Sequence, residues 1–252
     1  MAITFISVGA LGAGLNEVVP GLPAGWAEDD IFILHIEGEG EPDANADGQG
    51  DFGGALIGSV SSDDNGNAFD TRNTIYWKRA TGSETAPTVD DAGNHTIACI
   101  SAWRGCVATG NPIHKNQSSS EGGASGDRNS DVSADGVTTT IPEALIVIVV
   151  NNGDLTTISG WTNSNLVSIT EAFDLESDAG SNGHISAAYG VLTAASASGA
   201  TTATLDNNEM DANWVIALEP AAASGPVITD VDGDETWDDG DTGLVITGTG
   251  FV

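Results

Sequence analysis

The sequence predicts an all-β protein, an antiparallel two-sheet sandwich of jelly-roll type. Apolar residues make up 40% of the 252 positions and occur in short runs rather than in long stretches of helical period. Glycine is frequent, at 33 residues, and Thr, Ser, Asn and Asp are abundant, so turns are expected at short intervals. Short strands separated by many turns are typical of sandwiches and barrels.

Each predicted strand is a short apolar or alternating run bounded by turn residues. Pro20 and Pro23 exclude a helix before the second strand. The run 144–150 is β-branched and apolar throughout, as expected of a central strand buried on both faces. The region 116–135 has no such pattern and is expected to be an exposed loop. The other predicted strands are 3–8, one beginning at Ile31, 137–141, 166–173, 184–193 and 213–220, and residues 201–207 lead into the last of them.

The stretch 74–106 predicts a core hairpin, with a long polar loop between two strands. Trp77 and Trp103 lie within its strand patterns and are expected to point into the core. Cys99 and Cys106 are the two cysteines of the chain. We expect one of them to be buried in a strand and the other to lie in a turn, with a disulfide between them as the alternative.

Four of the six basic residues lie in or beside this stretch of an otherwise acidic chain. They are expected either to pair with acidic groups on a neighbouring subunit or to neutralise carboxylates within the same sandwich. These interface candidates are Arg72, Lys78, Arg79 and Arg104.

The formal net charge is −31, from 6 basic and 37 acidic side chains spread along the chain. Such a surface repels phosphate and anionic lipid, so neither nucleic acid nor membrane insertion is expected. No apolar run reaches the ~18–20 residues that span a bilayer, and the first residues lack the basic region of a secretory signal. The charge predicts a solvated surface or, alternatively, acidic loops that bind divalent cations.

One acidic loop has the ligand spacing of a calcium site. Asp43, Asn45, Asp47 and Asp51 match positions 1, 3, 5 and 9 of the EF-hand loop, and Gly48 matches its turn position. Position 12 is glycine instead of the bidentate glutamate, and no flanking helices are predicted. The loop is therefore interpreted either as a Ca²⁺ site or as a solvated acidic loop.

No catalytic motif is evident, and the protein is expected to be non-enzymatic. The chain lacks a G-x-S-x-G elbow, an H-x-x-x-H pair and a phosphate loop ending in GK[ST]. His35 lies between apolar neighbours in a predicted strand and is interpreted as a core residue. Trp26 and Trp161 follow glycines at turns, and they are the candidates for stacking on a sugar ring.

Several motifs resemble a family of tailed-bacteriophage virion structural proteins. The resemblance covers roughly residues 1–220 and implies a jelly-roll-like domain. Its motifs are a first strand MAITF at 1–5, PAGW at 23–26, WKRAT at 77–81, ETAPTV at 84–89 and WRGC at 103–106.

The C-terminal part of the chain resembles the opening of an IPT/TIG immunoglobulin-like module. Residues 221–225 read as a small-residue linker, and 226–252 contain two strand patterns around an acidic turn. Such a module takes about 100 residues, so this segment cannot close a domain alone. The natural chain is expected to continue, or the arm to pair with another protein.

Together these observations predict a structural protein on the surface of a tailed-phage virion, as a capsid decoration or a fibre. Its expected partners are other virion proteins and copies of itself, contacted through complementary surfaces. The alternative is a tail-associated carbohydrate or receptor-binding protein that contacts a host surface glycan through its loop tryptophans.

Overall fold

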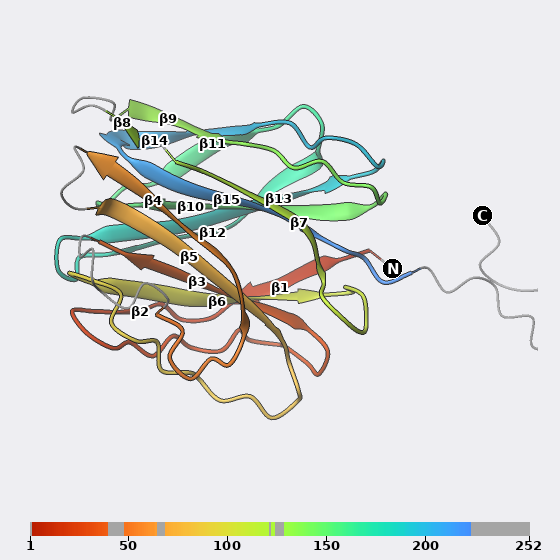
Figure 1. The fold of residues 1–252 in the computed structure, drawn as a ribbon, viewed down its shortest axis with the longest axis horizontal. Coiled ribbons are helices and arrows are strands. Elements are labelled where there is room, and N and C mark those ends of the chain that lie inside the picture. The colour runs from red at the N-terminus through yellow and green to blue at the C-terminus, as the bar shows by residue number, and fades with distance from the viewer. Residues whose placement is uncertain (1, 40–47, 65–68, 121, 124–128, 223–252) are drawn as a thin grey trace, which may run out of the picture.

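The computed structural model describes residues 2–39, 48–64, 69–120, 122–123 and 129–222. Within these ranges the chain forms 15 strands and no helix. No helix there is long and apolar enough to cross a membrane. The strands pack as antiparallel sheets (Figure 1), which confirms the predicted all-β sandwich.

The first sheet is built by the N-terminal part of the chain, in the order β1-β6-β3-β5-β4-β8, with β2 also paired to β6. Its pairings are antiparallel except for the short parallel contact between β4 and β8. The strands are β1 Thr4–Val8, β2 Gly12–Gly14, β3 Ile31–Gly38, β4 Ala55–Asp64, β5 Phe69–Arg79, β6 Thr96–Arg104 and β8 Gly122–Gly123.

The later strands form two further sheets, in the orders β12-β13-β10-β15-β7 and β11-β14-β9. The prediction of two sheets did not include the smaller of these. The strands are β7 Ile113–Ser120, β9 Asn129–Ala134, β10 Ala144–Asn152, β11 Ile158–Thr162, β12 Val167–Ser177, β13 Gly183–Leu192, β14 Thr201–Glu209 and β15 Asp211–Leu218.

The second sheet is the middle layer, with a hydrophobic core on each face. Along β10, Leu145, Val147 and Val149 pack toward the first sheet, whereas Ile146 and Ile148 pack toward the third. This alternation explains why every residue of β10 is buried. The uninterrupted apolar run thus reflects a strand covered on both sides, as the sequence predicted.

The outer face of the first sheet is covered by loops rather than by another sheet. Val18, Phe52 and Val89 come from three separate loops and pack with Leu34 and Ile100 of the sheet. Strand β3 is consequently buried along its whole length as well. These loops form the lower part of the molecule in Figure 1.

The predicted hairpin over 74–106 is wrong, because β3 lies between β5 and β6. Ile33 pairs with Trp77 on one side and with Ser101 on the other. The long loop after β5 allows the chain to pass β3, whose apolar faces favour the central position. The inward orientation of the tryptophans is confirmed, since Trp103 is fully buried and Trp77 packs against the core.

Two other expectations for secondary structure were also wrong. The region 116–135, expected as a loop, contains most of β7 and all of β9. Strand β7 is at the edge of its sheet and exposes most of its polar side chains, so hydrogen bonding to β15 forms it without an apolar pattern. Residues 137–141 form no strand and make only an isolated bridge, from Thr138 to Ala197.

Both cysteines are buried as free thiols. Cys99 lies in β6, and Cys106 follows the end of that strand. Of the predicted linker, Ala221 and Ala222 are described. The predicted immunoglobulin-like segment, 226–252, lies outside the described residues.

Candidate functional site

The motif segments found in the sequence meet at one end of the first sheet. Antiparallel pairing places the start of β3 beside the ends of β5 and β6, where Ile31 pairs with Arg79 and Trp103. Thr4 of β1 pairs with Arg104 at the same end. We call this region, formed by residues 23–30, 77–81 and 103–107, the motif corner.

Arg104 connects two motif segments and the start of β3. Its Nε lies 2.8 Å from Asp30 Oδ1, and its Nη2 lies 2.7 Å from Asp30 Oδ2. Nη2 also donates to the carbonyl of Gly25 at 3.1 Å. Asp30 is buried and accepts from the amide of Ala27, whereas the Arg104 side chain is 46% exposed. This bidentate ion pair fixes the turn that carries Trp26.

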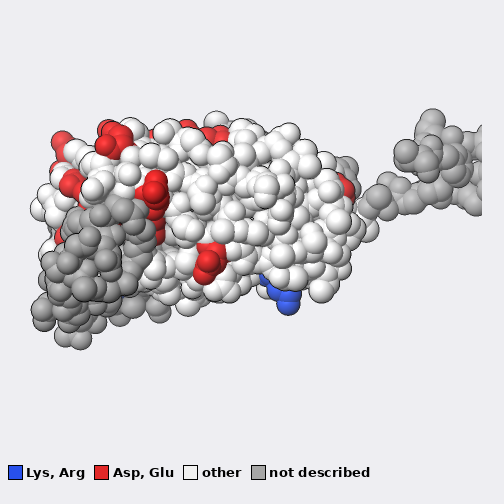
Figure 2. All heavy atoms as spheres, turned by 90° about the horizontal axis from the view of Figure 1, so that it is seen from above, with Lys and Arg blue, Asp and Glu red and all other residues white. Residues whose placement is uncertain are grey.

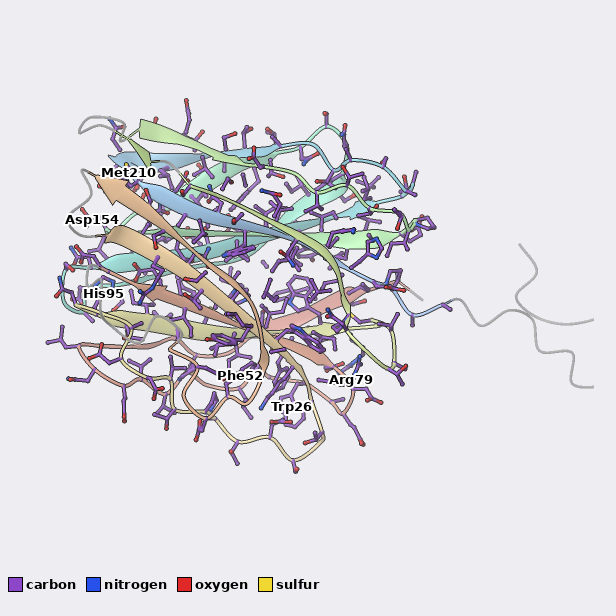
Figure 3. The ribbon with its side chains drawn as sticks, in the orientation of Figure 1. Trp26, Phe52, Arg79, His95, Asp154 and Met210 are labelled. Carbon is purple, nitrogen blue, oxygen red and sulfur yellow. The ribbon has the colours of Figure 1, made fainter. Side chains whose placement is uncertain are left out.

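Arg79 donates to main-chain carbonyls rather than to a carboxylate. Its Nη2 lies 2.7 Å from the carbonyl oxygen of Val107, and its Nη1 lies 3.3 Å from that of Asp29. The chain around it is held by hydrogen bonds between Asp29 and Ala80 and between Ala80 and Asp30. Arg79 therefore joins the ends of β5 and β6 to the turn before β3, and Figure 3 labels it in the same lower region of the view as Trp26.

Lys78 forms an ion pair with Glu84, with Nζ 2.5 Å from Oε2. The same ammonium lies 4.8 Å from the centre of the Phe52 ring. Burial alone would raise the pKa of Glu84, but its hydrogen bonds from Lys78 and Thr81 lower it overall. The polar loop after β5 is thereby fixed at its start.

Arg72 is buried and donates through Nη2 to the carbonyl of Ala92. All four predicted interface residues thus have contacts within the described chain. Whether they also contact another subunit stays a prediction. Arg104 offers more surface to a partner than either Arg72 or Lys78.

The two predicted sugar-binding tryptophans are half-buried and lie far apart in the fold. Trp26 packs edge-on against Phe32, with ring centres 5.4 Å apart. Trp161 in β11 packs on the core between the second and third sheets, and its Nε1 donates to Glu171 at 3.2 Å. The structure does not bring them together on one surface.

Of the predicted calcium ligands, Asp43, Asn45 and Asp47 lie outside the described residues. Asp51 is described, and its Oδ1 accepts a hydrogen bond from the amide of Thr88 at 2.6 Å. Across the described ranges no group of three or more His, Cys, Asp or Glu residues could hold a metal ion.

A buried polar group at the other end of the first sheet was not anticipated. Glu37 Oε2 of β3 lies 2.6 Å from His95 Nε2, and both side chains are fully buried. Thr71 donates to Glu37 Oε1 at 3.1 Å. His95 Nδ1 lies 3.2 Å from Ser181 Oγ and 3.5 Å from Glu39 Oε2. Acidic side chains gather toward this end of the face seen in Figure 2, and Figure 3 places His95 there.

The burial of this pair alters both pKa values. Loss of hydration raises the pKa of Glu37, and the hydrogen bond from His95 offsets this only in part. Burial alone would lower the pKa of His95, but the hydrogen bond and charge of Glu37 raise it overall. The folded pair therefore holds protons more tightly than the same groups in an unfolded chain.

A sequence signal for this pair does exist. Glu37 has the same phase along β3 as Ile31 and Ile33, which face the core between the first two sheets. A carboxylate on the inward face of a buried strand needs a partner. The sequence does not identify that partner, because His95 is 58 positions away.

The other buried histidines have different environments. His35 Nε2 lies 2.8 Å from Ser101 Oγ, and burial lowers its pKa to about 3. It is a core residue, as predicted. His184 Nδ1 lies 2.9 Å from Asn152 Oδ1, and its Nε2 is hydrogen-bonded to Asp174 Oδ1.

Comparison with known proteins gives no family assignment. No protein-family model matches the chain, and neither a curated protein nor a solved structure matches it.

Proposed function

We propose that the protein is a structural component of a tailed-phage virion surface and that the motif corner contacts its neighbour in the particle. The observation that carries the proposal is the convergence of the PAGW, WKRAT and WRGC segments. These segments are far apart in sequence. Arg104 nevertheless donates a hydrogen bond to the carbonyl of Gly25, and Arg79 donates one to the carbonyl of Val107. These segments carry the resemblance to virion structural proteins.

The corner combines a fixed backbone with exposed side chains, which suits a contact surface. Ala24, Ala27 and Glu28 are exposed on a turn that the Arg104–Asp30 pair holds in place. A preformed turn loses little conformational entropy on binding. The half-buried Trp26 adds an aromatic group of the kind that dominates many protein interfaces.

A charge reversal on this turn tests the proposal. Glu28→Lys changes an exposed side chain, so the fold should be preserved. Asp178→Lys is the matched control, because this exposed residue lies in the loop that contacts His95 at the other end of the sheet.

Each variant is incubated with virions that lack the protein, and bound protein is counted by quantitative mass spectrometry. Glu28→Lys is expected to lower occupancy at least several-fold with an unchanged Tm, while Asp178→Lys binds normally. Normal occupancy for Glu28→Lys, or an equal loss in both variants, would contradict a contact through the motif corner.

A further inference from the structure

Ser181, His95 and Glu37 form one continuous line of hydrogen bonds. The first distance is 3.2 Å from Ser181 Oγ to His95 Nδ1, and the second is 2.6 Å from His95 Nε2 to Glu37 Oε2. Above its raised pKa the His95 ring is neutral, and with its remaining proton on Nε2, toward Glu37, Nδ1 can accept the hydroxyl proton of Ser181. Thr71 donates to the other oxygen of Glu37 and fixes the carboxylate. A hydroxyl, a base and a group that orients the base are thus hydrogen-bonded to one another in that order.

The exposure of these three residues suits a serine that attacks a substrate. Ser181 is exposed, whereas His95 and Glu37 are fully buried. The base and its carboxylate are therefore shielded from water, whereas the residue that carries the hydroxyl is exposed. The pair formed by His35 and Ser101 has a similar distance, 2.8 Å, but both of its residues are buried, so no reagent can reach that serine.

The turn that carries Ser181 is built for close approach to the pair. Gly180 has φ +63°, and a Cβ at this position would lie 2.8 Å from His95 Cβ. A Cβ on Gly183 would lie 2.6 Å from Glu37 Oε2 and 2.7 Å from His95 Nε2. Asn182 donates from Nδ2 to Asp154 Oδ1 at 3.0 Å and so ties the turn to the β10–β11 loop. Glycines on both sides therefore allow Ser181 to reach the histidine.

The fold itself does not require this polar line. Well-packed apolar residues in place of a buried ion pair often leave a protein equally stable or more stable. The core between the first two sheets is made mainly of aliphatic and aromatic side chains, and its other buried polar groups, such as His35 and Ser101, are not connected to an exposed hydroxyl in the described contacts. A buried carboxylate–histidine pair that ends at an exposed hydroxyl is an arrangement that enzymes use to activate serine.

From this geometry we infer that Ser181 is an activated nucleophile that takes the acyl group of a small, uncharged ester and transfers it to water. This activity goes beyond the contact role of the motif corner, which lies at the opposite end of the first sheet. An uncharged substrate is favoured because the Glu39 carboxylate lies 3.5 Å from His95 Nδ1 and would repel an anionic substrate.

The reaction balances with water as the only co-reactant. Ser181 Oγ bonds to the acyl carbon while its proton moves to His95 Nδ1. The bond from the acyl carbon to the leaving alcohol then breaks, and that oxygen takes the proton from His95. Water next gives a proton to His95 and adds to the acyl carbon. The bond to Ser181 Oγ breaks, the serine regains its proton, and the acid leaves.

Two probes test the inference on the full chain. A fluorophosphonate labels activated serines, and peptide mapping locates the label. Hydrolysis of p-nitrophenyl acetate measures acyl transfer with a good leaving group. The variants are Ser181→Ala and Glu37→Gln. Ser164→Ala is the control, because Ser164 is also exposed but its hydroxyl bonds to Asn165 Oδ1, at 3.3 Å, rather than to a histidine.

The expected result is a label on Ser181 and a hydrolysis rate about 10²-fold above that of Ser181→Ala. Ser164→Ala should match the wild-type chain, and Glu37→Gln should reduce both readouts. Because Ser181 is exposed, its alanine variant should fold, and circular dichroism checks this. An unlabelled Ser181, or equal hydrolysis by the wild-type chain and folded Ser181→Ala, would show that Ser181 only caps the buried pair.

Discussion

Glu37 and His95 are hydrogen-bonded at 2.6 Å with no exposed surface on either side chain. They join the central strand of the first sheet to the loop before β6, and the turn after β12 covers them through Ser181. Both titratable side chains are therefore shielded from water. The pH dependence of stability should report this pair directly.

The unfolding free energy should decrease as the pH rises through this pair. The pKa of Glu37 is raised above 4.5 and that of His95 above 6.5, so the folded chain binds more protons than the unfolded chain. The contribution is complete below these ordinary values and is lost as the pH passes the folded values. Glu37→Gln removes one raised pKa and the main cause that raises the other, so it should flatten the profile.

Urea unfolding between pH 4.5 and 9 measures this effect. His114→Gln serves as a control, since this histidine lies at the edge strand β7 away from the pair. A Glu37→Gln profile as steep as that of the wild-type chain would contradict the expected linkage.

His35 should act in the opposite direction, at acid pH. Its folded pKa is about 3 against an ordinary 6.5, so the unfolded chain binds the proton first as the pH falls. The gap corresponds to about 5 kcal/mol of unfolding free energy lost between pH 6.5 and pH 3. His35→Gln keeps a partner for Ser101 but does not titrate, so its acid-unfolding midpoint should lie at lower pH. An unchanged midpoint would show that His35 is protonated in the fold.

The Arg104–Asp30 pair should stabilise the motif corner. Arg104→Ala leaves the buried Asp30 without its two guanidinium hydrogen bonds, so the unfolding free energy should fall measurably. Lys115→Ala, on the exposed edge strand β7, should change stability by less than about 0.5 kcal/mol. In a double-mutant cycle with Asp30→Ala the losses should be strongly non-additive; additive losses would mean that the pair contributes nothing.

Gly58 allows the first two sheets to approach at the β4 edge. A Cβ at this position would lie 2.2 Å from Cη2 of Trp214 in the second sheet. Gly58→Ala should therefore destabilise the fold by about 1–3 kcal/mol. Trp214→Phe removes the atom in conflict, so adding Gly58→Ala to Trp214→Phe should cost much less than in the wild-type chain. Equal costs in both backgrounds would rule out this contact as the cause.

The two thiols should be unreactive in the folded chain. Cys99 is fully buried and Cys106 is 8% exposed, and burial raises the pKa of Cys106 to about 12. Thiol titration with Ellman's reagent should find almost no reaction until urea unfolds the protein. Fast reaction of one thiol under native conditions would show that the end of β6 opens.

The sequence predicted strands that depend on local apolar runs, and it missed features that depend on pairing between distant parts of the chain. Local pattern located β1, β3, β10 and β15, because their apolar runs are long and their boundaries carry turn residues. It failed for β7, whose exposed polar residues become a strand only through pairing with β15. It also failed for the order of β3, β5 and β6. The apolar patterns of β5 and β6 fit a hairpin between these two strands as well as two strands that flank β3.

The functional regions show the same limit. Arg79 and Arg104 stood out in sequence as rare cations, but their joint position in the motif corner follows from strand register. Ser181, His95 and Glu37 could not be grouped from the sequence, because no local motif connects positions that lie 58 and 86 residues apart. The expectation of a non-enzymatic protein rested on local motifs alone and stays a prediction.

Oxidative footprinting of the two half-buried tryptophans tests the central proposal most directly. Trp26 lies in the motif corner, and Trp161 lies in the third sheet. Hydroxyl-radical oxidation of both is compared in the free protein and in purified virions that carry it. A several-fold fall in the oxidation of Trp26, with that of Trp161 unchanged, is the predicted result. Equal oxidation of Trp26 in both states would contradict the assignment of the motif corner as the face buried on assembly.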